Sequence, residues 1–359
     1  MTNLNDYIKW RGELAFSTET FTTVDMLIFT QLVYAPMENI PPSDYGKKLT
    51  DLFQAVYPEG IPSGATFVND DIFNLWKLAV ESMRFGEIRL ENFVSKFDTQ
   101  QQMQFAAATF TYNGIVVVAF RGTDTSVIGW REDFNMGYES PIPSQTEAVA
   151  YVNSLLAKNN GIYLCGHSKG GNLAIYSGAF CKRSKKITGI YSFDGPGFDD
   201  AVFATKEWKA VEHKIYSFIP ESSIVGLLLG YFPKYTIVKS DNVGIMQHNP
   251  FNWHVFGSNF VQAPENSFSS RLLNETMHRF LEKCPKDQRR VLIETAFKII
   301  EASGAQTAKE IPAGLLKHFS EVKQIVQEVP EEDKQALSEM GKIFADAGSV
   351  SFKKLLSEL

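Results

Sequence analysis

The chain has 359 residues, of which 44% are hydrophobic and 21% charged, and its formal net charge at pH 7 is −6. This composition is typical of a globular protein with one large core, and the acidic balance argues against nucleic acid as the main partner. The first residues form neither a basic segment nor an apolar one, and the longest apolar runs fall short of a membrane span. We therefore expect a cytoplasmic protein without a secretion signal or a transmembrane segment.

The N-terminal part is expected to be helical. Apolar residues recur at helical spacing over residues 20–33, and the patterns at 45–56 and 70–83 also favour helices. We expect these helices to cover one side of a sheet that begins near residue 89.

The middle of the chain predicts the sheet. Strands are expected over residues 90–97, 103–112 and 115–120, and Asn113-Gly114 is a typical hairpin turn between the last two. Further strands are expected at 161–165, 187–193, 215–219 and 235–239, with helices at 145–158 and 199–212 between them. This alternation predicts an α/β fold with a doubly wound, mostly parallel sheet flanked by helices.

From about residue 268 the pattern is helical only, with helices expected at 269–281, 286–302, 308–326 and 331–347. Their charged faces are typical of solvated surfaces, and they contain no catalytic constellation. We therefore expect an α/β domain over residues 1–262, with a helical part at 1–85 and the sheet and site at 86–262. An all-helical C-terminal extension at 263–359 follows.

One motif organises the site. Gly166-His167-Ser168-Lys169-Gly170 fits the G-x-S-x-G pattern, in which a serine occupies a strained turn between a strand and a helix. The pattern predicts Ser168 as a nucleophile. Glycine is expected at 166 and 170 because a side chain there would collide with the neighbouring strand or helix.

A serine nucleophile needs a base and an acid that orients the base. His248 and His254 lie in the loop where the base is expected, and His248 is favoured because His254 follows Trp253 and is open to local packing. The other histidines lie inside the turn, at a helix end or in the helical tail. Three acids remain open. Glu221 is favoured because it ends the second strand after Ser168, and Asp194 and Asp241 are the alternatives.

The oxyanion hole is expected to combine the backbone N–H of Lys169 with the N–H and hydroxyl of Thr123. Thr123 follows the strand that we expect beside the Ser168 strand. An ion pair between Arg121 and Asp133 is expected to hold this loop.

These motifs carry a resemblance. The segment Val118-Ala119-Phe120-Arg121-Gly122-Thr123, Trp130 with Asp133, and the Ser168 turn resemble class 3 (fungal-type) lipases. The chain from Gly166 to Ala174, Ser222-Ser223-Ile224-Val225-Gly226 and Gln247-His248-Asn249 more closely resembles an uncharacterised bacterial lipase-like domain family of the α/β-hydrolase fold. The resemblance covers roughly residues 1–260. It implies Ser168 as nucleophile, His248 as base, and Thr123 with Lys169 as oxyanion hole. Two positions depart from class 3 lipases: Glu221 stands where they have aspartate, and Lys169 where they usually have an apolar residue.

The sequence therefore predicts a serine hydrolase that cleaves a carboxylic ester, with a small-molecule or lipid ester as substrate and no metal or organic cofactor. Residues 127–130 and 224–229 are candidates for an apolar acyl pocket or lid, with ordinary core as the alternative. A thioesterase or acyltransferase would use the same triad. An inactive hydrolase-fold protein that binds a protein partner is the rival from another class.

Overall fold

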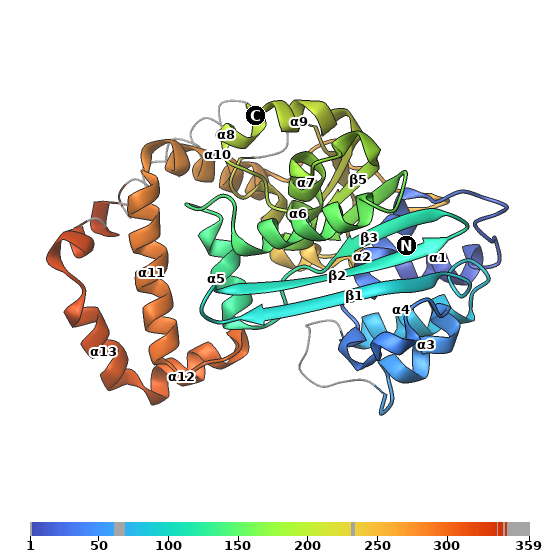
Figure 1. The fold of residues 1–359 in the computed structure, drawn as a ribbon. Coiled ribbons are helices and arrows are strands. Elements are labelled where there is room, and N and C mark those ends of the chain that lie inside the picture. Colours follow the sequence, from blue (N-terminus) through green and yellow to red (C-terminus); the bar gives the residue numbers. More distant parts are fainter. Residues whose placement is uncertain (1, 61–68, 231–233, 336, 340–341, 343–359) are drawn as a thin grey trace.

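The computed structural model describes residues 2–60, 69–230, 234–335, 337–339 and 342. Its centre is a seven-stranded sheet with strands in sequence order from β1 to β7 (Figure 1). The strands are β1 (Arg89–Asp98), β2 (Met103–Tyr112), β3 (Ile115–Phe120), β4 (Ile162–His167), β5 (Ile187–Phe193), β6 (Ile215–Pro220) and β7 (Thr236–Val238). The first two pairs are antiparallel and the next four are parallel. A mostly parallel sheet flanked by helices, as expected, is confirmed.

Residue choice explains the hairpin between β2 and β3. Asn113 and Gly114 have φ angles of 47° and 81°. A two-residue turn with both angles positive matches the twist of the strands that it joins, and asparagine and glycine are the residues that tolerate it best.

The strand order explains how both faces are covered. Successive residues of β2 and β3 point into two different cores, as the two-residue repeat of a strand requires. The helices α6 (Pro143–Leu156), α7 (Lys169–Phe180), α8 (Asp200–Phe203) and α9 (Lys206–Val211) follow one another between the parallel strands, and all four contribute buried residues to one core. The other core comes from α1 (Leu4–Arg11), α2 (Thr23–Leu32), α3 (Leu49–Val56) and α4 (Asn69–Glu81). Because the strands follow one another in sequence order, the helices that connect them do not form the second layer. The N-terminal helices form it instead.

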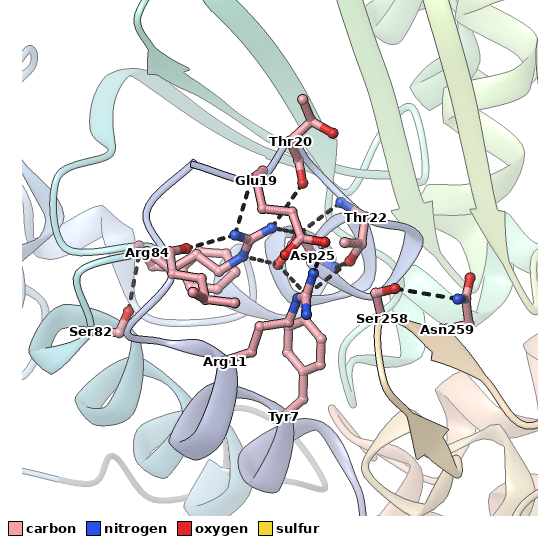
Figure 2. Close-up of polar contacts among 12 residues, drawn as sticks. Tyr7, Arg11, Glu19, Thr20, Thr22, Asp25, Ser82, Arg84, Ser258 and Asn259 are labelled. Carbon is pink, nitrogen blue, oxygen red and sulfur yellow. Dashed lines mark hydrogen bonds and ion pairs between the residues drawn. The ribbon is translucent and has the colours of Figure 1, made fainter. Parts of the chain in front are cut away.

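A buried ion pair joins the N-terminal helices (Figure 2). Arg84 and Asp25 have fully buried side chains, 2.6 Å apart at their closest N and O atoms. The guanidinium also donates to the backbone carbonyls of Leu14, Glu19 and Thr20, and the Tyr7 hydroxyl donates to Asp25. Because every charge in this cluster is hydrogen-bonded, the pair fixes α1, α2 and the segment after α4 relative to one another.

Between β3 and β4 the chain forms α5 (Val127–Asn135), a helix that the sequence analysis did not expect. Val127, the first residue of the candidate pocket or lid segment 127–130, is buried with Ile293, Phe297 and Ala305. Val127 therefore belongs to the core between α5 and the C-terminal helices, which is the alternative to a pocket or lid. In the segment 224–229, Leu227 is likewise buried.

The C-terminal helices are α10 (Phe268–Lys283), α11 (Lys286–Ala302), α12 (Ile311–Lys317) and α13 (Phe319–Glu328). In Figure 1, α11, α12 and α13 form the orange and red arm, with α11 next to α5. The helix expected at 308–326 is divided into α12 and α13. Of the helix expected at 331–347, the residues that the structure describes (331–335, 337–339 and 342) are helical, and the others lie outside the described ranges. Within the described ranges, no helix is both long and apolar enough to cross a membrane.

Candidate active site

The candidate residues follow the carboxyl ends of neighbouring strands. Thr123 comes shortly after β3, Ser168 directly after β4 and Asp194 directly after β5. Because β3, β4 and β5 are parallel neighbours, these ends meet at one edge of the sheet. That edge is where open α/β sheets bind ligands.

The turn at Ser168 has the strained geometry that its motif predicts. Ser168 has φ 58° and ψ −135°, a conformation that an L-residue rarely adopts. A Cβ on Gly166 would lie 2.0 Å from the backbone of Gly170, and one on Gly170 would lie 2.2 Å from the carbonyl oxygen of Phe120. Both glycines are therefore required because β4, α7 and β3 approach one another too closely for a side chain.

His248 lies against this turn, in the 3-10 helix η6 (Gly244–His248). Its ring centroid is 4.5 Å from that of His167, and the His167 Nε2 atom is 2.9 Å from the His248 carbonyl oxygen. Burial lowers the pKa of His167 well below its ordinary value, so this ring is neutral at pH 7 and its Nε2–H donates to that carbonyl. His167 thus holds His248 against the residue that precedes Ser168.

The carboxylate that orients His248 is Asp194. Its Oδ2 atom is 2.6 Å from the His248 Nδ1 atom, and its side chain is fully buried. Its Oδ1 atom accepts from the Ser223 hydroxyl at 2.5 Å and from the Gly226 N–H at 3.0 Å. Because Nδ1–H donates to this carboxylate, Nε2 is left as the basic nitrogen. In the described part of the chain, the Ser168 hydroxyl and the His248 ring are not hydrogen-bonded to each other. Such bonds are often long before substrate binds.

The expectation for the acid is corrected by this geometry. Glu221 was favoured because it ends the second strand after Ser168, but β5, the first strand, is the direct neighbour of the Ser168 strand. The backbone of Glu221 is bound by the last strand and by the segment before α10, at Val238 and Ser267. The His248 loop reaches back past β6 to the end of β5.

The third candidate acid serves the other histidine. Asp241 Oδ1 is 2.6 Å from the Nε2 atom of His254, and His254 is buried. The hydrogen bond to His254 lowers the pKa of Asp241. The two histidines of the loop are thus paired with different carboxylates, and the structure brings His248, not His254, to the Ser168 turn.

The loop after β3 packs directly on the turn. A Cβ on Gly122 would lie 2.6 Å from the carbonyl oxygen of His167 and 3.1 Å from Cβ of Ser168. The Thr123 hydroxyl donates to Asp133 Oδ2 at 2.6 Å. This hydroxyl is therefore engaged with Asp133, which leaves the backbone N–H of Thr123 as its available donor. As the first residue of α7, Lys169 also has a backbone N–H without a partner inside the helix.

Three side chains near this loop have partners that differ from the sequence-based expectation or go beyond it. Arg121 pairs with Glu38 at 2.9 Å, so the expected ion pair with Asp133 is wrong. Asp133 instead holds Thr123, and burial raises its pKa to about 6 despite the opposing effects of Lys169 and Thr123. The Lys169 ammonium points away from solvent and binds Glu132 at 2.9 Å.

The comparison with family models decides the family. The Mbeg1-like model matches residues 79–298, more than half of the chain and a range that contains Thr123, Ser168, Asp194 and His248. The chain belongs to the Mbeg1-like family. No curated protein shows a significant match. Among solved structures, the crystal structure of M37 lipase matches with 16% sequence identity and a TM-score of 0.34, and the match covers 56% of this chain and 67% of that one.

Several side chains that shape the site of this Mbeg1-like protein were missed by sequence reasoning. Asn172 is buried in α7 and donates to the carbonyls of Pro196 and Gly197, which anchors the loop after Asp194. Gln247 accepts from the backbone N–H of Ser222 and so ties the His248 loop to the loop after β6. The sequence does show an asparagine one turn after Ser168 and a glutamine beside His248. Neither residue type, however, indicates which backbone group its side chain will bind.

Proposed function

We propose that this protein is a serine hydrolase that cleaves a carboxylic ester through an acyl-enzyme on Ser168. The observation that carries the proposal is the contact between His248 Nδ1 and the buried carboxylate of Asp194, beside a serine held in a strained turn. Strain of this kind persists at functional sites because the surrounding structure imposes it.

The geometry supports a definite sequence of steps. Ser168 Oγ attacks the acyl carbonyl carbon while His248 Nε2 takes the hydroxyl proton. The ionised Asp194 stabilises the imidazolium that forms. The backbone N–H groups of Lys169 and Thr123 bind the oxyanion of the tetrahedral intermediate. The intermediate then expels the alcohol, to which His248 returns the proton, and water hydrolyses the acyl-enzyme by the same route.

Kinetics on short-chain p-nitrophenyl esters test the proposal. Ser168→Ala and His248→Ala are each expected to lower kcat by about 10⁴-fold or more, because the nucleophile and the base act as one unit. Ser177→Ala is the matched control, since Ser177 is a buried serine of α7, the helix that begins after Ser168. Its hydroxyl donates to the backbone carbonyl of Ala174 one turn back. It is expected to keep wild-type kcat.

Two outcomes would count against the proposal. A folded wild type without activity on esters or thioesters favours the inactive, partner-binding protein. Activity on thioesters alone, lost in the same variants, keeps the triad and changes the substrate class.

A further inference from the structure

The side chain of Lys169 is fully buried, although it directly follows the proposed nucleophile. Its ammonium donates to Glu132 Oε2 at 2.9 Å and to the carbonyl oxygen of Gln104 at 2.8 Å. Lysine is almost never fully buried unless it is paired. The proposed function uses only the backbone N–H of this residue, so the buried charge has no role in it.

Glu132 is also fully buried, and the four hydrogen bonds of its carboxylate join α5 to three other segments. Besides Lys169, it accepts from the backbone N–H of Gln104 in β2, and from the N–H and hydroxyl of Ser144 at the start of α6. The pair therefore links α7, α5, β2 and α6 directly behind the Ser168 turn. A buried ion pair of this kind is weak evidence for stability, because apolar residues of similar volume are often as stable.

The next residue carries the link to the oxyanion hole. Asp133 Oδ2 accepts the Thr123 hydroxyl at 2.6 Å. Asp133 Oδ1 is buried, has no hydrogen-bond partner and lies 4.0 Å from the Lys169 ammonium. The ammonium thus faces two consecutive carboxylates of α5, one that it binds and one that holds Thr123.

We propose that the Lys169 side chain is a positioning residue for the oxyanion hole. Its ammonium attracts Asp133 towards the Ser168 turn, and Asp133 in turn holds Thr123 at the correct distance from the Lys169 N–H. The inference rests on the proposed function, since it concerns the hole that stabilises the intermediate. It assigns a role to the position at which class 3 lipases usually have an apolar residue.

The test uses kcat and KM with p-nitrophenyl butyrate for Lys169→Met/Glu132→Gln. This double variant removes both charges of the Lys169–Glu132 pair together, so neither of these two partners is left as an unpaired buried ion. We expect kcat to fall about tenfold and KM to change less than about twofold, because a misplaced donor weakens transition-state binding more than substrate binding. Lys214→Met is the matched control, since the Lys214 ammonium binds the backbone carbonyls of Lys185 and Ile187 at the start of β5, at the opposite edge of the sheet.

Repeating the test in a Thr123→Val background separates a positioning role of Lys169 from a general contribution to the stability of the fold. Thr123→Val removes the hydroxyl that connects Thr123 to Asp133. In that background the Lys169/Glu132 double variant is expected to cost less than about twofold in kcat, because the link is already broken. Equal losses in both backgrounds, or an unchanged kcat in the folded double variant, would overturn the inference.

Three further outcomes also decide between the alternatives. If the double variant does not fold, Asp133→Asn tests the link from its other end: a kcat loss of about tenfold at constant KM supports the inference, and an unchanged kcat overturns it. A folded wild type that is inactive overturns the proposed function and this inference with it. An active wild type with no coupling overturns the inference alone.

Discussion

At the scale of single residues, the hydrogen bond between His248 and Asp194 makes Asp194 the proposed acid. Asp194→Asn is expected to lower kcat by roughly 10⁴-fold, because an amide holds His248 in the wrong tautomer. Glu221→Gln and Asp241→Asn are the matched controls and are expected to stay within about threefold of wild type. Ester hydrolysis by the three purified variants measures this. A severe loss in Glu221→Gln alone would return the role to Glu221.

Asp133 gives a prediction about pH and stability. Its folded pKa of about 6 lies above its ordinary value of 3.8, so between these values the folded state holds a proton that the unfolded state has lost. Its contribution to stability is therefore full below about pH 4 and is lost as the pH rises through 6. Wild type should be more stable relative to Asp133→Asn at pH 4.5 than at pH 7.5. Urea unfolding at both values measures the difference, and a constant difference would contradict the shift.

At the scale of elements, the contact between α7 and β3 leaves no space for a side chain at Gly170. Gly170→Ala would place a methyl group 2.2 Å from the carbonyl oxygen of Phe120, which is backbone and cannot rotate away. We expect a loss of about 3 kcal/mol in the free energy of unfolding, together with loss of ester hydrolysis.

The control for this prediction lies in the same helix. A Cβ on Gly178 would meet the end of the Ile190 side chain at 2.5 Å, and that end can change rotamer. Gly178→Ala is therefore expected to cost less than half as much. Chemical denaturation compares the two variants, and equal costs would show that backbone proximity is not the cause.

At the scale of the whole molecule, the buried Arg84–Asp25 pair holds the N-terminal helices together in the layer that covers one face of the sheet. Arg84→Met leaves the Asp25 charge buried without its partner and is expected to destabilise the protein by about 3–5 kcal/mol. Lys47→Met removes one partner of an exposed pair with Asp44 and should cost less than about 1 kcal/mol. Thermal unfolding distinguishes them, and similar losses would contradict the account of the cluster in Figure 2.

Much of this architecture could be predicted because local patterns specify it. The bounds of β2, β3 and β5 agree with the sequence expectation residue for residue, since each is an apolar run ended by a turn or by a short polar loop. The Ser168 turn could be predicted because its glycines are required by steric contact. The partner of His248 could not, because it depends on which strand adjoins β4 and on how far a loop reaches. α5 was missed because its apolar face packs on α11, more than 150 residues away in the chain.

The proposed function requires Ser168 to be an activated nucleophile. The most direct measurement is the intact mass of the protein after reaction with a fluorophosphonate, followed by peptide mapping of the adduct. The account predicts one adduct per chain, on Ser168, that is absent in Ser168→Ala and formed far more slowly in Asp194→Asn and His248→Ala. Folded wild type that gains no adduct, or that carries it on another residue, would contradict the account.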